Sequence, residues 1–160
     1  MIYVCSLTII LAIIIVAEIV RKYSKKYKSK ISFREALDLT GLPVITLFQN
    51  NKKFNFLLDT GSEGSVLNSV YLNKVENTPI KDKQMLIYGV GGTVEAFYVS
   101  ATFTKNQDYD IEFMVADISE ALDTVKSETG VTIHGIIGNN FFEKYKYVID
   151  YKSMIAYSKC

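Results

Sequence analysis

The feature that most constrains the fold is an apolar segment that ends in an ionisable group. Residues 54–58 read Phe-Asn-Phe-Leu-Leu, a pattern typical of a buried β-strand. Asp59, Thr60 and Gly61 follow at once, so a carboxylate stands where the strand turns. Burying a lone carboxylate is costly unless it is hydrogen-bonded. The sequence therefore predicts that nearby hydroxyl groups and backbone amides of the turn are partners of Asp59.

Two further motifs follow Asp-Thr-Gly in the chain. Taken alone, Asp-Thr-Gly is typical of a turn that closes a hairpin. The glycine-rich segment 88–92 and the Gly-Ile-Ile-Gly segment 135–138, which precedes a helical pattern, add to it. In this order, residues 57–67, 88–92 and 135–138 resemble the retropepsin-like aspartic proteases, the single-domain relatives of retroviral proteases. The resemblance covers roughly residues 40–157.

The resemblance implies a mostly β domain, a closed β-barrel or sandwich with one or two short helices. It also implies an aspartic endopeptidase, in which two carboxylates share one proton and activate water. The chain has one Asp-Thr-Gly motif, so the second Asp59 would come from another copy. A homodimer acting on an extended peptide or protein is expected. The alternatives are a catalytically silent peptide-binding module of the same fold and a structural dimer tethered to a membrane.

The resemblance also assigns roles to individual residues. Asp59 would be the catalytic residue, and Thr60 would hydrogen-bond across the dimer. Gly61 would keep the backbone close to the carboxylates, and the Ser62 hydroxyl would support Asp59. The strand expected to pack beneath this loop contains Ile136, Ile137 and Gly138.

A glycine-rich hairpin tip is expected between the other two motifs. Glycine accepts positive φ and loses the most entropy when it is ordered, so three glycines in four residues favour a mobile tip. An ordinary turn would explain the same composition. The position between the two other motifs favours a flap that covers the substrate, made of Gly89, Val90, Gly91 and Gly92.

The N-terminal segment predicts a membrane anchor. Residues 2–20 are almost all apolar, with Glu18 as the one charged residue, and about 19 residues of helix at about 1.5 Å each nearly span a bilayer core. A signal peptide is disfavoured because no basic residue precedes the segment and no small-residue cleavage site follows. We expect an anchor at 1–20, a basic linker at 21–31 and the protease-like domain at 32–160. The basic linker predicts that this domain is cytoplasmic.

Composition excludes several classes of function. Residues 31–160 hold 12 of the 18 basic residues and 16 of the 17 acidic ones, so this part is mildly acidic and nucleic-acid binding is not expected. Cys5 and Cys160 stand at the two ends, which argues against a disulfide framework. The one histidine, His134, is expected to be a hydrogen-bonded structural residue. No spacing of His, Cys and carboxylates suggests a metal, and no cofactor is expected.

The remaining pattern predicts the other elements. Ser32 and Glu35 have the spacing of a capping box, which predicts a short helix before Gly41. Residues 117–130 are charged and are expected to form a loop with one helical turn. Pro79 is expected to mark a boundary. Strands are expected at 44–48, 54–58, 65–67, 83–88, 93–104, 109–116, 132–137, 147–150 and 154–157, and a short helix at 139–145.

Overall fold

The computed structural model describes residues 32–89 and 92–159, the side chains of 82–96 excepted. The helices are α2 (Phe33–Thr40), the 3-10 helix η1 (Ser69–Lys74), α3 (Ser119–Thr129) and α4 (Asn139–Tyr145). The strands are β1 (Val44–Gln49), β2 (Lys52–Leu58), β3 (Ser65–Asn68), β4 (Thr78–Gly89), β5 (Gly92–Thr104), β6 (Asp108–Ala116), β7 (Gly135–Ile137), β8 (Tyr147–Asp150) and β9 (Ile155–Ser158).

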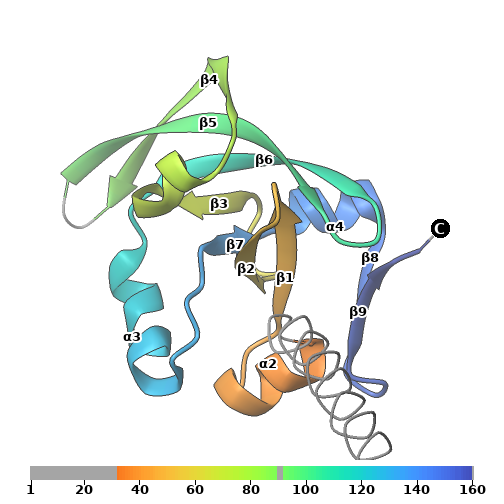
Figure 1. The fold of residues 1–160 in the computed structure, drawn as a ribbon. Helices are drawn as coiled ribbons and strands as arrows, with labels where there is room; N and C mark the ends of the chain where they lie inside the picture. Colours follow the sequence, from red (N-terminus) through yellow and green to blue (C-terminus); the bar gives the residue numbers. More distant parts are fainter. Residues whose placement is uncertain (1–31, 90–91, 160) are drawn as a thin grey trace, which may run out of the picture. The chain divides into compact units, whose positions relative to one another are not determined.

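Six strands close into a barrel. Their order is β1-β2-β7-β3-β6-β5, and a pairing of β1 with β5 closes the ring (Figure 1). The closing pair is Phe48 with Thr104. β4 adds to the outer edge of β5, and β8 and β9 form a separate two-stranded sheet. The expected mostly β, closed barrel is confirmed.

Aromatic side chains fill the barrel. Phe56, Phe103 and Phe113 are fully buried, and their rings lie 5.1 Å (Phe56 to Phe103) and 5.5 Å (Phe56 to Phe113) apart. In β2 the residues Phe54, Phe56 and Leu58 face this core, as the period of a strand requires. Burial of large rings is the main stabilising contribution of such a core. Because these residues hold β2 in the core, they also fix the position of Asp59, which directly follows the strand.

The short N-terminal helix forms as its sequence predicts. The Ser32 hydroxyl accepts a hydrogen bond from the Glu35 N–H at 3.1 Å, and the Glu35 carboxylate accepts one from the Ser32 N–H at 3.4 Å. Gly41 ends α2 with a φ of 68°. The capping box is therefore confirmed.

Two expectations about helices are wrong. Residues 117–130 form an eleven-residue helix, α3, instead of a loop with one turn. Leu122 is its one buried residue, so the apolar stripe that marks a helix in a sequence is weak. With α2, α3 and α4 the described residues hold three α-helices, more than the one or two expected.

The boundary expected at Pro79 is found within one residue of it, because β4 begins at Thr78. Pro79 pairs with Val99, and the register shifts between Ile80 and Gln84. β4 is an edge strand with an irregularity, which is where a sheet tolerates proline. The strand expected at 132–137 is shorter, because regular pairing begins at Gly135.

The expected anchor and linker, residues 1–31, lie outside the described residues. Within 32–89 and 92–159, no helix combines the length and the apolar character that a membrane crossing needs.

Candidate active site

Asp59 lies where β2 leaves the barrel, at the start of a loop that we call the Asp59 loop (residues 59–64). The Asp59 N–H donates to the Ile137 carbonyl at 3.0 Å, which extends the parallel pairing of β2 with β7 by one bond. Leu57 pairs with Ile136 and Leu58 with Ile137. The strand of Ile136 and Ile137 therefore flanks the base of the loop and fixes where it begins.

The carboxylate of Asp59 is held by the backbone of its own turn. The side-chain Oδ1 accepts a hydrogen bond from the Gly61 N–H at 2.8 Å. The backbone carbonyl of Asp59 accepts one from the Ser62 N–H at 3.2 Å. A Cβ on Gly61 would lie 3.2 Å from Oδ1, a tight contact. Gly61 thus supplies the amide and leaves the space that the carboxylate needs.

The Ser62 hydroxyl has a different partner from the one expected. The Ser62 hydroxyl donates to the Gly64 carbonyl at 2.7 Å, so its proton is not directed at Asp59. The Thr60 residue is exposed, and Asp59 is partly exposed. Among the described residues of one copy, the carboxylate accepts its hydrogen bond from the backbone amide of Gly61.

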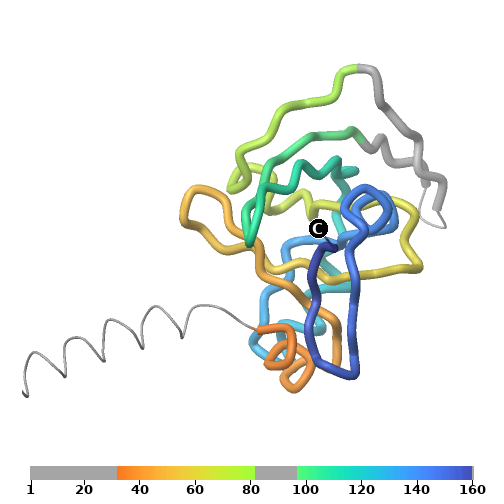
Figure 2. The backbone as a smooth tube through the Cα atoms, turned by 90° about the vertical axis from the view of Figure 1, so that its right-hand side faces the viewer, coloured from red at the N-terminus to blue at the C-terminus, as the bar shows by residue number. Residues whose placement is uncertain are grey.

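The start of α4 lies against the Asp59 loop, and Figure 2 shows the yellow loop backbone beside the blue helix. The Asn139 N–H donates to the Ser62 carbonyl at 2.8 Å, and the Asn140 N–H donates to the Glu63 carbonyl at 3.2 Å. A Cβ on Gly138 would overlap the Gly64 carbonyl and lie 2.8 Å from the Ser62 oxygen. Gly138 is therefore required for the close approach of helix and loop.

A buried hydroxyl joins β3 to the start of α4. Ser65 is 1% exposed, and its Oγ accepts from the Gly138 N–H at 3.1 Å and donates to the Asn140 Oδ1 at 2.7 Å. Sequence reasoning missed Ser65, Asn139 and Asn140 as parts of the site. The available signals were a serine inside an apolar strand and two asparagines, a residue type that favours helix starts, directly after Gly138.

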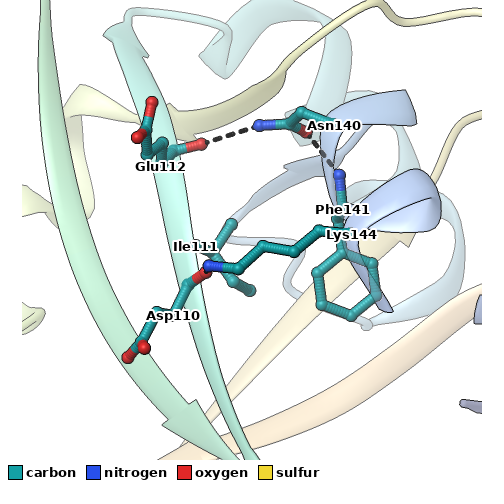
Figure 3. A pocket seen from close by; sticks show the side chains of 6 residues that line it. All are labelled: Asp110, Ile111, Glu112, Asn140, Phe141 and Lys144. Carbon is teal, nitrogen blue, oxygen red and sulfur yellow. Dashed lines mark hydrogen bonds between the residues drawn. The ribbon is translucent and has the colours of Figure 1, made fainter. Parts of the chain in front are cut away.

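A hollow of about 230 Å³ lies between β6 and α4 (Figure 3). Two side chains of α4 reach the edge of β6 there: the Asn140 amide donates to the Glu112 carbonyl at 3.2 Å, and Lys144 Nζ donates to the Asp110 carbonyl at 2.8 Å. A larger hollow of about 620 Å³ is lined by residues such as Gln49, Glu76 and Thr102. Neither hollow includes a residue of the Asp59 loop.

His134 is a structural residue, as expected. Its Nδ1 accepts from the Asn55 N–H at 3.0 Å, and its ring lies 4.6 Å from that of Tyr71 and 5.2 Å from that of Phe54. Burial lowers the pKa of His134, and nearby Lys74 adds to this effect. Over the described part of the chain, no three His, Cys, Asp or Glu side chains gather as a metal site would require.

The glycine-rich segment joins β4 to β5. Tyr88 pairs with Thr93 and Gly89 with Gly92, so a hairpin is confirmed up to this pair. Val90 and Gly91, the middle of the expected flap, lie outside the described residues.

The chain matches the family model of the aspartyl proteases over residues 45–141, more than half of its length. It is similar to the Pol polyproteins of equine infectious anemia virus, strain Wyoming and isolate 1369, with 35% identity over 77 residues in each case. This region is 48% of the chain and 7% of each polyprotein, so the chain spans a small part of these relatives.

Among solved structures, it is similar to the EIAV protease complexed with the inhibitor HBY-793. The identity is 26%, the match covers 64% of this chain and 86% of that chain, and the TM-score is 0.44. The region of the family match includes the Asp59 loop, the β4–β5 hairpin and β7 with the start of α4. The chain belongs to the aspartyl protease family.

Proposed function

We propose that this chain is an aspartic endopeptidase whose active site contains two Asp59 residues, one from each copy in a homodimer. The observation that carries the proposal is the placement of Asp59: a partly exposed carboxylate on a loop fixed by β7 and α4, in a chain with one Asp-Thr-Gly motif. Two carboxylates a few ångströms apart cannot both ionise, so they share a proton.

The shared proton gives the two carboxylates different tasks. The ionised Asp59 takes a proton from a water molecule, and the water oxygen attacks the peptide carbonyl. The protonated Asp59 donates to that carbonyl oxygen, which gives a tetrahedral gem-diol. The Asp59 that took the water proton then passes it to the leaving nitrogen as the C–N bond breaks, and a gem-diol hydroxyl returns a proton to the other Asp59, so the pair again shares one proton. The Gly61 N–H donates to Oδ1 and so fixes the orientation of the Asp59 carboxylate. Exposed Thr60 is available to contact the other copy, the role that the family resemblance implies.

We also propose that the Gly89–Gly92 hairpin tip covers an extended peptide segment. The paired strands β4 and β5 support the hairpin up to Gly89 and Gly92. A peptide held beneath it would lie in an extended conformation, because strand-like backbone hydrogen bonds suit that shape. Closure over the peptide would exclude water from the reacting atoms.

We propose that residues 1–20 anchor the protein in a membrane and that residues 32–160 lie on the cytoplasmic side. The support is the apolar segment 2–20 followed by six basic residues between Arg21 and Lys30. Anchoring confines the copies to a plane and raises their effective concentration for dimerisation. A reporter fused after Cys160 tests the orientation: it should resist protease added outside intact cells, and its digestion there would refute a cytoplasmic domain.

The test of the enzyme is cleavage of a peptide library at several pH values by the full chain. The Asp59→Asn variant should cut nothing, and Asp123→Asn, on the exposed side of α3, should cut like the parent. An Asp59→Asn protein that still cuts the same peptides would refute the mechanism. A parent that binds extended peptides and cuts none would identify a peptide-binding module instead.

A further inference from the structure

We propose that Asn139, the first residue of α4, is a positioning residue that sets the orientation of the peptide group facing the Asp59 carboxylate. This inference rests on the proposed function of Asp59. It concerns the side chain of Asn139, for which the family motif in the sequence suggested no role.

The amide side chain of Asn139 acts on one peptide group of the Asp59 loop. Its Nδ2 donates to the Thr60 carbonyl at 3.0 Å. That carbonyl and the Gly61 N–H belong to the same planar peptide unit, and the Gly61 N–H donates to Asp59 Oδ1 at 2.8 Å. One peptide plane is therefore held at both ends, by Asn139 on its oxygen and by Asp59 on its nitrogen.

This arrangement has a direct consequence for the carboxylate. A peptide unit can rotate about its flanking bonds, and rotation by half a turn would direct the Thr60 carbonyl oxygen, instead of an N–H, towards Asp59. The Asn139 hydrogen bond opposes that rotation. It also polarises the peptide group, which strengthens donation from the Gly61 N–H at the far end. Gly61 needs such support more than other residues, because glycine has the widest range of backbone conformations.

The side chain of Asn139 is separable from the docking of α4. Docking uses backbone groups and other side chains: the Asn139 and Asn140 N–H groups, the Ser65 hydroxyl and the buried ring of Phe141. Truncation of Asn139 leaves all of these in place. A variant at this position is therefore expected to keep its fold while the 60–61 peptide group gains freedom.

The experiment compares Asn139→Ala, Asn139→Asp and Asn139→Gln in the full chain, with Asn73→Ala as a matched control on the exposed side of η1. The Ala variant loses the donor. The Asp variant has the same shape but places a carboxylate oxygen against the Thr60 carbonyl. The Gln variant keeps a donor on a longer side chain and should recover part of the loss.

Two readouts are measured. For Asn139→Ala we expect kcat to fall about tenfold, as for loss of one well-placed hydrogen bond, with KM changed less than about twofold. The kcat of Asn139→Asp should fall further than that of Asn139→Ala. Hydrogen exchange of peptides covering residues 60–62 should be about five- to tenfold faster in both variants, with the amides of β5 and β6 unchanged.

Parent-like kcat and parent-like exchange in Asn139→Ala would overturn the inference. So would a loss of activity that follows a fall in melting temperature, because a purely structural residue would act in that way. Hydrogen exchange does not depend on cleavage. If parent and Asp59→Asn are both inactive, the proposed function fails, and exchange at residues 60–62 alone decides whether Asn139 fixes this peptide group.

Discussion

Gly138 lies so close to Gly64 that a Cβ on Gly138 would overlap the Gly64 carbonyl oxygen and lie 2.6 Å from its carbonyl carbon. The reverse is not true, because a Cβ on Gly64 would meet no atom within 4 Å. The contact joins the end of the Asp59 loop to the start of α4. The position of the loop therefore depends on the absence of a side chain at one particular glycine.

The first prediction uses this asymmetry. Gly138→Ala should destabilise the protein by about 1–3 kcal/mol, because the added methyl group must displace backbone atoms. Gly64→Ala is the matched control and should change stability by less than about 0.5 kcal/mol. Urea unfolding of the three proteins checks both values. Equal stability of Gly138→Ala and the parent would show that the helix and loop separate freely.

The second prediction concerns the buried hydroxyl of Ser65. Ser65→Ala leaves the Gly138 N–H and the Asn140 Oδ1 without this partner, and a buried unsatisfied group costs about 1–3 kcal/mol. Ser127→Ala on exposed α3 is the control and should be nearly neutral. Thermal unfolding measures the difference. A parent-like melting temperature for Ser65→Ala would mean that this network adds nothing to stability.

The third prediction is the pH dependence contributed by His134. Because burial lowers its pKa in the folded protein, the unfolded chain binds more protons once the pH falls below the ordinary value of about 6.5. The contribution of His134 to stability is therefore present above about pH 6.5 and is lost as the pH falls through the folded-state pKa.

A matched variant isolates this contribution. Asn at position 134 can keep an acceptor near the Asn55 N–H but does not titrate in this range. The free energy of unfolding of the parent should therefore decrease relative to that of His134→Asn between about pH 7.5 and 5. A difference that stays constant over this range would contradict the assignment.

The fourth prediction concerns the glycine-rich hairpin tip. Gly91→Val restricts the backbone of the expected flap, so turnover should slow several-fold while the melting temperature stays close to that of the parent. Thr124→Val on exposed α3 provides a control for the added apolar surface. Turnover by Gly91→Val at the parent rate would remove the flap from the mechanism.

The parts of the fold that the sequence predicts are those set by local pattern. The polar turn between β1 and β2 contains Asn50 and Asn51 with φ values of 50° and 62°, a conformation that asparagine tolerates well. The alternation of Phe54, Phe56 and Leu58 indicates β2 and places Asp59 at its end. These signals need no knowledge of the rest of the chain.

The parts of the fold and the site that the sequence does not predict depend on tertiary contacts. The hydrogen bond from Asn139 to Thr60 joins residues 79 apart in the sequence, and no local pattern marks it. The same holds for Ser65, whose partners Gly138 and Asn140 lie at the start of α4. The helix α3 was missed because most of its residues face solvent, so it shows little apolar periodicity.

The central claim is a site shared by two copies, and mixing parent with Asp59→Asn protein tests it most directly. In an equimolar mixture that exchanges freely, about one quarter of the dimers carry two Asp59 residues, so cleavage per parent chain should fall to about half, and an excess of the variant should lower it further. Cleavage per parent chain that is independent of added Asp59→Asn protein would contradict the shared site.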